Sequence, residues 1–553
     1  MLKPRAELII IILILALAAI LRLGNLTSAD VITDESLIAF RSIGLIDFLA
    51  SPNQTTPWEW FSDGSIPAWA KLSFHDHPPL VFWLQHFTFK IFGQNLLALR
   101  LPFVLAGVLS VYLIYLLGKK LFSEKAGLTA SFLLAICSYH VWVSRIGLQE
   151  SIVIFLTLLT FYLFLKNLED KKHWQWGIAL GLALLTKYTA LIILPIIIIY
   201  LLIFYRPVFK TKNFWLGPIS AGLTFSPVVI YNFKLYQAFG HFDLQFSYLF
   251  GQKVLAWQNL PGKEQIGSLA ERVINLPLSL YNNLSLPFLF LAIFSLLFFI
   301  YFWFRQRDKK TSFILIIILN YCLLFLLIGS SMRFVVILIP YLVLILAFVF
   351  ERLKFFRFKL VYGVLIIFGS FELFFSYNSL ISPYPVSQKF YSPTLRTESY
   401  RWGYNQLDNY LDNLLKNEMP AATLQTRYQF LEKIKTQALA RAVAENKKPK
   451  ARLLIYDSNM YDLATLWLFH RRLVYQGWPI VTADIYLQQG KNFWQKQGIT
   501  DFYFIEILDQ NILQQPKDKR SDLAINLAGS LGNLKPEIIS RLDGKQVFAV
   551  YHW

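Results

Sequence analysis

The feature that most constrains the fold of this chain is a succession of long apolar runs separated by short polar connections. An apolar run of about 20 residues can cross the hydrocarbon core of a bilayer as a helix, which satisfies its own backbone hydrogen bonds there. We therefore predict an α-helical, polytopic membrane protein with about eleven spans. The expected spans are 8–21, 96–118, 127–143, 151–166, 174–187, 189–205, 214–232, 284–304, 312–330, 334–350 and 360–376.

Composition supports this class. The 553 residues are 56% hydrophobic and 16% charged, a balance that excludes an ordinary soluble protein of this length. The formal charge of +19 could indicate nucleic-acid binding, but no nucleic-acid-binding motif is present, so we expect no nucleic-acid partner. Cys137 and Cys322 both lie in apolar runs, which excludes a disulfide framework.

The basic residues follow the expected topology. With the N-terminus in the cytoplasm, every inner connection is rich in Lys and Arg, and the short outer connections carry single charges, as the positive-inside rule requires. The inner connections hold Lys119, Lys120 and Lys125; Lys166, Lys171 and Lys172; Arg206, Lys210 and Lys212; Arg305, Arg307, Lys309 and Lys310; and Arg352, Lys354, Arg357 and Lys359. We expect a multi-pass protein of the cell (inner or plasma) membrane whose polar C-terminal portion lies outside.

Two long polar loops share the outer side. The first covers about residues 25–95 and the second about residues 233–283. Within the first, Leu80 to Phe92 is too short and too polar to span and is expected to form a helix at the membrane interface. A membrane protein with its polar surface gathered on one side is expected to work on that side.

The composition changes after residue 376, and we place the boundary of a second domain there, 1–376 against 377–553. Helices are expected over 401–417, 423–445 and 485–497, and strands over Leu453–Tyr456, Phe502–Ile505 and Val547–Val550. Strands that alternate with helices predict a small α/β domain on the outer face. Asp457, at the end of one strand, fits a turn residue better than a site.

Ionisable residues near membrane level are few, and charge there tends to mark a functional site. Carboxylates can deprotonate an attacking hydroxyl, and Lys or Arg can hold a phosphate as it leaves. Such a set suits a transferase that uses a phosphate-activated donor embedded in the lipid. Its members are Asp34, Glu35, His75, Asp76, His77, Arg100, Arg145, Glu150, Lys187 and Arg333.

Simpler interpretations stay open for several of them. Asp34 and Glu35 could be solvated loop charges, and Arg145 and Lys187 could be anchors that reach toward the interface. The run His75 to His77 could bind a divalent metal, although three adjacent residues seldom supply three ligands. The prolines that follow this run can set a rigid entry into the interfacial helix.

The order of short motifs resembles that of a known class. The motifs are Asp34-Glu35, His77-Pro78-Pro79-Leu80, Phe92-Gly93, Arg100-Leu101-Pro102, Ser144-Arg145 with Glu150, and Leu185-Thr186-Lys187-Tyr188. Over about residues 1–235 the chain is similar to the C-type (GT-C) membrane glycosyltransferases. Within them it most resembles the dolichyl-phosphate-mannose–protein mannosyltransferase group, whose bacterial relatives include the lipid A aminoarabinose transferase.

The resemblance implies inverting transfer of a monosaccharide from a polyprenyl-phosphate donor to a protein hydroxyl, a lipid or a surface glycan. It implies that Asp34 activates the acceptor, with Glu35 beside it and Glu150 in support. Lys187 is expected at the donor phosphate, Arg145 and Arg100 are further candidates there, and His77 is a candidate for positioning substrate.

No cofactor is expected to be required, with a divalent metal as the less favoured possibility. The chain has no Trp-Trp-Asp motif, which argues against transfer of a whole glycan to Asn. The alternative function is a non-enzymatic lipid or polysaccharide transporter or flippase, and a receptor or scaffold is a third. A transporter would be expected to carry polar residues along several mid-span segments, which here are almost purely Leu, Ile and Phe.

Overall fold

The computed structural model describes residues 4–48, 56, 61, 66–254, 267–382, 401–426, 428–513 and 520–553, without the side chains of residues 354–358. The chain divides into two compact units. The first comprises Met1–Leu26, Pro52–Gln54 and Ala68–Arg396, and the second comprises Thr27–Ser51, Thr55–Pro67 and Thr397–Trp553. The predicted boundary near residue 376 assigned the whole first outer loop, 25–95, to the membrane domain. In the structure, most of the first half of that loop groups with the C-terminal portion instead. Residues 383–400 lie outside the described residues.

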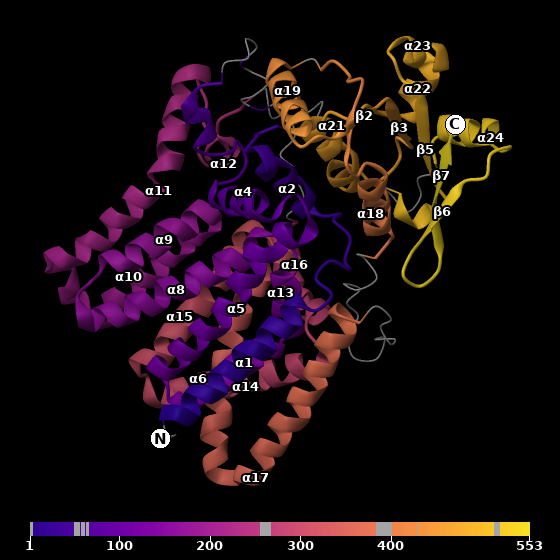
Figure 1. The fold of residues 1–553 in the computed structure, drawn as a ribbon. Helices are drawn as coiled ribbons and strands as arrows, with labels where there is room; N and C mark the ends of the chain where they lie inside the picture. The colour runs from indigo at the N-terminus through magenta and orange to yellow at the C-terminus, as the bar shows by residue number, and fades with distance from the viewer. Residues whose placement is uncertain are drawn as a thin grey trace. The chain divides into compact units, whose positions relative to one another are not determined.

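The first unit is entirely helical among its described residues (Figure 1). Its elements are α1 (Pro4–Leu23), η1 (Ala68–Lys71), α4 (Leu80–Phe92), α5 (Leu96–Leu121), α6 (Glu124–Ile136), α7 (Ser138–Ser144), α8 (Gln149–Asp170), α9 (Trp174–Thr186), η2 (Tyr188–Ile192), α10 (Ile193–Phe204), η3 (Arg206–Lys210), α11 (Lys212–Phe239), α12 (Leu244–Leu249), α13 (Leu269–Asn283), α14 (Leu286–Gln306), α15 (Lys309–Ile328), α16 (Met332–Val335), η4 (Val336–Leu338) and α17 (Ile339–Leu380).

Each expected span falls on an apolar helix. Among the described residues, eight helices are long and apolar enough to cross a membrane, and the bent pair α6–α7 makes up to nine. The expected spans 174–187 and 189–205 correspond to two shorter apolar helices, Trp174–Thr186 and Tyr188–Phe204. The polytopic helical fold is confirmed. Two of the eleven predicted spans therefore correspond to helices of fewer than 18 residues.

The span predicted over 127–143 is broken at Cys137, where α6 and α7 meet at a bend of 64°. A break inside a bilayer leaves backbone groups that must find partners within the protein. Arg22, fully buried, donates to the carbonyl of Ala135 at 3.1 Å on the α6 side. On the α7 side, the Ser138 N–H donates to Glu372 at 3.0 Å. Because both ends of the break have side-chain partners, α7 is held in a new direction that leads to Arg145 and α8.

Helix α9 packs closely against α11. A methyl group added at Gly177 would lie 2.0 Å from the carbonyl oxygen of Gly217, closer than any real contact. Glycine at such a position lets two membrane helices approach at backbone distance. This packing holds α9, the helix that ends just before Lys187, against α11.

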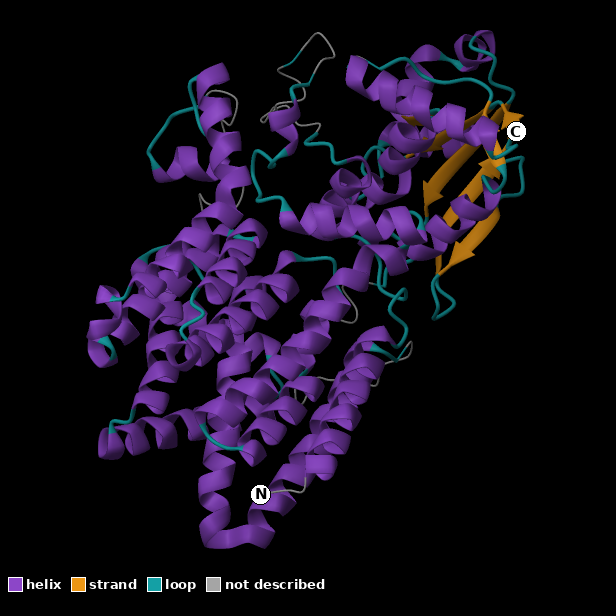
Figure 2. Ribbon diagram, turned by 60° about the vertical axis from the view of Figure 1, so that its left-hand side comes forward, coloured by secondary structure: helices purple, strands orange, loops and turns teal. Residues whose placement is uncertain are grey.

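The second unit combines helices with a sheet, and Figure 2 shows its strands gathered side by side with helices packed against them. Its elements are α2 (Asp34–Gly44), α18 (Tyr404–Leu414), β1 (Glu418–Pro420), α19 (Gln429–Ala444), β2 (Lys448–Lys450), β3 (Arg452–Tyr456), α20 (Asp462–Thr465), the π-helical turn η6 (Leu466–His470), α21 (Arg471–Gln476), β4 (Ile480–Thr482), α22 (Ala483–Gln489), α23 (Lys491–Lys496), β5 (Asp501–Ile507), η7 (Gln510–Ile512), α24 (Asp522–Ser530), β6 (Glu537–Ser540) and β7 (Gln546–His552).

The main sheet has the strand order β4-β3-β5-β7-β6. β3 pairs in parallel with β4 and β5, and β7 pairs antiparallel with β5 and β6. The central strands β3, β5 and β7 cover the three predicted strands, so the small α/β sheet is confirmed. The edge strands β4 and β6 were not predicted, because each has only three or four residues.

The segment before α2 is bound to the start of α18 through Asp30. Its carboxylate accepts hydrogen bonds from the backbone N–H groups of Gly403 at 3.1 Å and Asn405 at 2.9 Å, and also from that of Trp402. In return, the Asn405 side chain donates to the carbonyls of Thr27 and Ala29. These are the orphan N–H groups of a helix N-terminus, so a carboxylate binds there with the favourable sign of the helix dipole.

Because the carboxyl group of Asp30 is buried, we expect the free energy of unfolding to depend on pH. Burial raises the pKa of its carboxyl from 3.8 to about 6, against the opposing effect of the backbone N–H donors. The folded state therefore binds the proton more tightly than the unfolded state. The contribution of Asp30 is fully present below about pH 4 and is lost as the pH rises through about 6, by about 3 kcal/mol in total.

The measurement is the unfolding midpoint of the native protein and of an Asp30→Asn variant between pH 4 and 8. We expect the native midpoint to fall relative to that of the variant as the pH rises, because the neutral amide removes this titration. Parallel curves for the two proteins would contradict the assignment. The exposed Asp462 in the same unit supplies the control Asp462→Asn, whose curve should follow that of the native protein.

Candidate active site

Glu150 and Lys187 form the central ion pair of the first unit. Glu150 lies in the first turn of α8, and Lys187 directly follows the last residue of α9. Because α8 and α9 are neighbours joined by a short connection, the start of one and the end of the other lie at the same level. Lys187 Nζ donates to Glu150 Oε1 at 2.6 Å. The side chain of Glu150 is buried, and that of Lys187 stays 17% exposed.

This pair lies at a small, partly open recess. The remaining lining is mainly apolar and comes from α8, η2, α15, α16 and η4: Val153, Ile154, Thr189, Tyr321, Leu324, Phe325, Ile328, Phe334 and Ile337. Lys187 Nζ also lies 4.1 Å from the centre of the Phe334 ring, a cation–π contact. The site thus combines one polar end with an apolar wall.

Arg333 adds a second cation at the same place. It lies close enough to Glu150 for a direct electrostatic interaction, with Lys187 as the nearer partner. Two cations around one buried carboxylate leave a local excess of positive charge. Sequence reasoning included Arg333 in the set of outer charges but assigned it no role, because its distance to Glu150 depends on a helix far along the chain.

Arg145 contacts the end of α1, and Arg100 contacts the turn that follows it. Arg145 donates to the carbonyls of Leu21 at 2.9 Å and Arg22 at 3.0 Å, and Arg100 donates to that of Leu26 at 2.7 Å. The last carbonyls of a helix have no partners within it, and guanidinium groups satisfy them well. These contacts favour a structural role, and the predicted contact with a donor phosphate stays a prediction.

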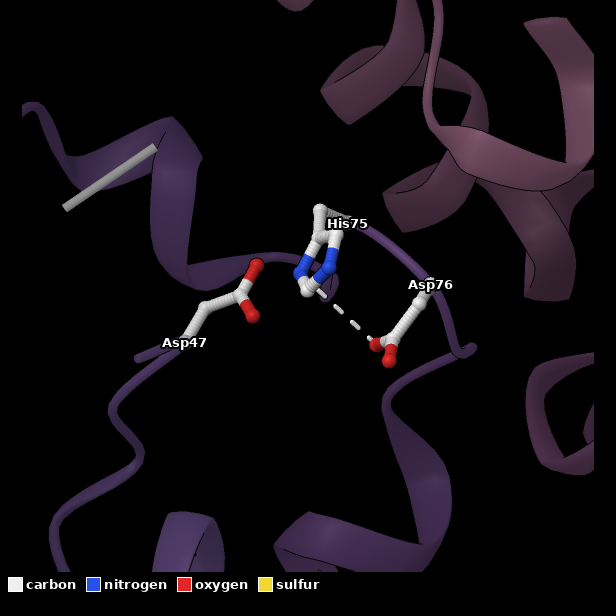
Figure 3. A group of neighbouring side chains, drawn as sticks. All are labelled: Asp47, His75 and Asp76. Carbon is white, nitrogen blue, oxygen red and sulfur yellow. Dashed lines mark ion pairs between the residues drawn. The ribbon is translucent and has the colours of Figure 1, made fainter. Parts of the chain in front are cut away.

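The run His75 to His77 is held by the second long loop. The Leu244 N–H, at the start of α12, donates to the His75 carbonyl at 2.7 Å. Asp76 lies between the two histidines, 3.7 Å from His75 and 3.0 Å from His77, and Figure 3 shows the first of these ion pairs. The interfacial helix follows as α4, with the predicted bounds. The side chain of His77 is 37% exposed, and its role with substrate stays a prediction.

Asp243 connects this loop to the residue after Lys187. It caps the N-terminus of α12, and its carboxylate accepts hydrogen bonds from the Tyr188 hydroxyl at 2.8 Å and the Asn232 amide at 3.1 Å. Burial raises the pKa of the Asp243 carboxyl, against the opposing effect of these donors. Sequence reasoning passed over Asp243, since an acid in a polar loop gives no sign of burial.

Asp34 and Glu35 belong to the second unit, in the first turn of α2. The Thr33 hydroxyl caps this helix by accepting from the Glu35 N–H at 3.3 Å. Glu35 is buried, whereas Asp34 is half-buried and close to Tyr461. Burial first, and then the Asp34 carboxylate, raise the pKa of the Tyr461 hydroxyl. Of the two acids, Asp34 is therefore the one whose carboxylate can meet a substrate.

Comparisons with known proteins find similar sequences and a similar fold. Residues 76–231 match the sequence model of the dolichyl-phosphate-mannose-protein mannosyltransferase family, PMT_2. YkcB of Bacillus subtilis (strain 168) is 34% identical over 142 residues, or 25% of this chain and 20% of that protein. The undecaprenyl phosphate-alpha-4-amino-4-deoxy-L-arabinose arabinosyl transferase of Pseudomonas savastanoi pv. phaseolicola is 29% identical over 139 residues, or 24% of this chain. The chain spans 20% and 26% of the lengths of these two relatives.

The fold extends the likeness beyond the matched segment. The crystal structure of ArnT from Cupriavidus metallidurans bound to undecaprenyl phosphate covers 99% of this chain and 98% of its own, with a TM-score of 0.54 at 12% identity. The fold of this chain is therefore that of the ArnT structure. Residues 76–231 are similar to the dolichyl-phosphate-mannose-protein mannosyltransferase family, and about a quarter of the chain is similar to an arabinosyl transferase. These similarities confirm the resemblance to the C-type (GT-C) membrane glycosyltransferases seen in the sequence.

Proposed function

We propose that this protein is an inverting glycosyltransferase that moves a monosaccharide from a polyprenyl-phosphate donor to a hydroxyl-bearing acceptor on the outer side of the membrane. The observation that carries the proposal is the ion pair of Glu150 and Lys187 at the polar end of an apolar recess. A lipid-linked phosphate needs both of these surfaces at once, cations for its head and an apolar wall for its chain.

Lys187 has the geometry of a phosphate ligand. Its ammonium carries three donors, of which one goes to Glu150, and its side chain is partly exposed. Glu150 holds the ammonium in place and Arg333 adds positive charge. When the bond between sugar and phosphate breaks, these cations stabilise the negative charge that develops on the leaving phosphate.

Asp34 is proposed to act on the acceptor. The acceptor oxygen forms a bond to the anomeric carbon while the bond from that carbon to the phosphate oxygen breaks. The acceptor proton passes to the Asp34 carboxylate, and the polyprenyl phosphate leaves with the bonding electron pair. A single displacement of this kind inverts the anomeric centre and requires one base and one stabilised leaving group.

The proposed acceptor, metal requirement and membrane orientation are those expected from the sequence. The acceptor is a glycolipid, a surface glycan or a protein hydroxyl. No metal is required, because Lys187 and Arg333 already supply positive charge. The N-terminus is cytoplasmic and the C-terminal portion outside, in keeping with the basic inner connections.

The Lys187→Ala variant tests the donor site. We expect the affinity for undecaprenyl phosphate to fall roughly 10- to 100-fold, because a charge-assisted hydrogen bond to an anion is lost. Binding is measured in nanodiscs with the full-length protein. Lys166 lies near the other end of α8, is 47% exposed and supplies the control Lys166→Ala. Equal affinities for the native protein and the Lys187 variant would contradict the phosphate role.

Activity is tested with native protein and a panel of undecaprenyl-phosphate-linked mannose, glucose and 4-amino-4-deoxyarabinose. The acceptor is the total lipid and protein of native membranes, with products read by mass spectrometry. Transfer of one of the three sugars supports the proposal. If none of them is transferred while labelled lipid crosses vesicles that contain the protein, the transporter alternative takes its place.

A further inference from the structure

The helix that carries Asp34 folds with the C-terminal portion of the chain, although more than 350 residues of sequence separate them. Two sets of contacts, one before α2 and one at its end, produce this arrangement. Both sets lie within the second unit.

Before α2, the contacts centre on Asp30, four residues from Asp34. Asp30 is 1% exposed and binds the backbone N–H groups at the start of α18. Asn405 closes the ring by donating to the carbonyls of Thr27 at 2.9 Å and Ala29 at 2.6 Å. The chain that enters α2 is therefore fixed on both sides by one short stretch, residues 402–405.

At its end, α2 is held by α21. The Tyr475 hydroxyl donates to the Phe40 carbonyl at 2.7 Å, and the two rings lie 5.4 Å apart. Phe40 and Tyr475 belong to a buried cluster that also contains Ile46, Phe48 and Phe430. An added methyl at Gly44 would lie 2.7 Å from the Tyr475 ring, so the helix cannot shift toward α21. With both ends held, the position of Asp34 is set by the C-terminal portion.

Two aromatic side chains, Tyr461 and Trp402, lie in the same part of the second unit as Asp34. Tyr461 interacts electrostatically with Asp34, and its ring lies 6.1 Å from that of Trp402, nearly perpendicular to it. Both rings are partly exposed. The backbone N–H of Trp402 is one of the donors to Asp30. Asp30 thus links the segment that enters α2 to the aromatic pair beside Asp34.

We propose that Asp30 is a positioning residue for Asp34, and that the C-terminal unit serves as the scaffold of the acceptor-activating carboxylate. This inference rests on the proposed role of Asp34. Without Asp30, the N–H groups of residues 402–405 lose their common partner and the entry to α2 is released. A displacement of about 1 Å at a reacting group can cost around 100-fold in rate. The donor recess is built from first-unit residues alone and should be unaffected.

The kinetic test compares Asp30→Ala with Asp30→Asn in the full-length protein, using the sugar donor that the native protein accepts. We expect Asp30→Ala to lower kcat roughly 10- to 100-fold with the donor KM unchanged. Asp30→Asn keeps one of the two acceptor oxygens, enough for the Trp402 and Gly403 N–H groups that share Oδ2, and should restore part of kcat. A rise in donor KM equal to the fall in kcat, without recovery in the Asn variant, would overturn the proposal.

Asp457 supplies a matched control. It is also a fully buried acid of the second unit that accepts backbone N–H groups, those of Asn459 at 2.9 Å and Ser521 at 3.2 Å. Neither of these two donors belongs to α2 or to the segment that enters it. Asp457→Ala should lower the unfolding midpoint about as much as Asp30→Ala while leaving kcat within twofold of native. A loss of kcat as large as that of Asp30→Ala would mean that any damage to this unit suffices, and would overturn the positioning role.

Hydrogen exchange separates this inference from the proposed function. The α2 amides, Glu35 to Gly44, should exchange at least tenfold faster in Asp30→Ala than in native protein, and at the native rate in Asp457→Ala. Unchanged exchange in Asp30→Ala would overturn the inference whatever the activity. Faster exchange with native kcat would instead show that Asp34 is not the base, and would overturn the proposed function at that residue.

Discussion

The Asp34→Asn variant should lose sugar transfer by a factor of about 10² to 10⁴ in kcat, the usual contribution of a general base. The amide has nearly the shape of the carboxylate and should leave α2 in place, but it cannot accept the acceptor proton. The affinity for undecaprenyl phosphate should stay at the native value, since Glu150, Lys187 and the recess are untouched. The measurement is initial-rate kinetics combined with donor-lipid binding in nanodiscs.

Asp462→Asn is the matched control for this prediction. Asp462 belongs to the same unit and, like Asp34, interacts electrostatically with Tyr461. It differs from Asp34 in being exposed, whereas Asp34 is half-buried. We expect it to keep kcat within about twofold of native. Activity of Asp34→Asn above a tenth of the native value would remove Asp34 from the mechanism.

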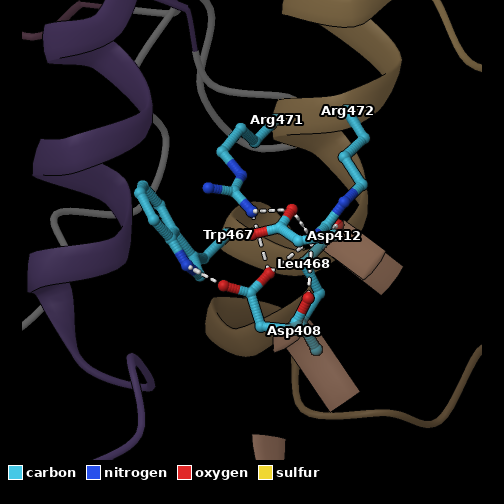
Figure 4. Close-up of polar contacts among 6 residues, drawn as sticks. All are labelled: Asp408, Asp412, Trp467, Leu468, Arg471 and Arg472. Atoms are coloured by element: carbon cyan, nitrogen blue, oxygen red, sulfur yellow. Dashed lines mark hydrogen bonds and ion pairs between the residues drawn. The ribbon is translucent and has the colours of Figure 1, made fainter. Parts of the chain in front are cut away.

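The second large effect is expected on stability, from a buried charge network in the second unit (Figure 4). Asp408 accepts hydrogen bonds from Trp467 Nε1 at 2.9 Å and Arg471 at 2.8 Å, and lies 2.8 Å from Arg472. Both arginines are at most 1% exposed. Asp412 binds the same two arginines from a position that is 52% exposed.

Asp408→Ala should lower the free energy of unfolding by about 3–5 kcal/mol, because it leaves two adjacent guanidinium groups buried with one carboxylate between them. The readout is the midpoint of thermal or denaturant unfolding of the full-length protein. Asp412→Ala removes an acid from the same network at its exposed edge and should cost about 1 kcal/mol or less. Equal losses in the two variants would contradict the view that burial makes Asp408 decisive.

Much of the membrane part could be predicted from sequence because the signal is local. A run of apolar residues long enough to cross a bilayer identifies a helix without reference to its neighbours, and all eleven predicted runs coincide with apolar helices. The central strands β3, β5 and β7 were equally accessible, since each is a short apolar run buried on both faces.

The roles of single charged residues were harder to predict, because their partners are distant in the sequence. Arg145, Arg100 and Lys187 look alike as isolated cations near span ends. The structure directs the two arginines to carbonyls at the end of α1 and in the turn that follows it, and Lys187 to Glu150. The apolar wall contributed by α15 has no motif of its own, so the recess could not be predicted.

The sequence by itself determined the class of fold, the approximate spans, the resemblance to GT-C enzymes and the set of candidate residues, because apolar length and motif order are properties of the chain alone. Tertiary structure decided which candidates meet. It paired Glu150 with Lys187, bent the third span at Cys137 and bound the segment of Asp34 to residues 402–405 through Asp30. These contacts depend on packing between distant segments, where burial and hydrogen-bond geometry select the partners and no local pattern records the outcome.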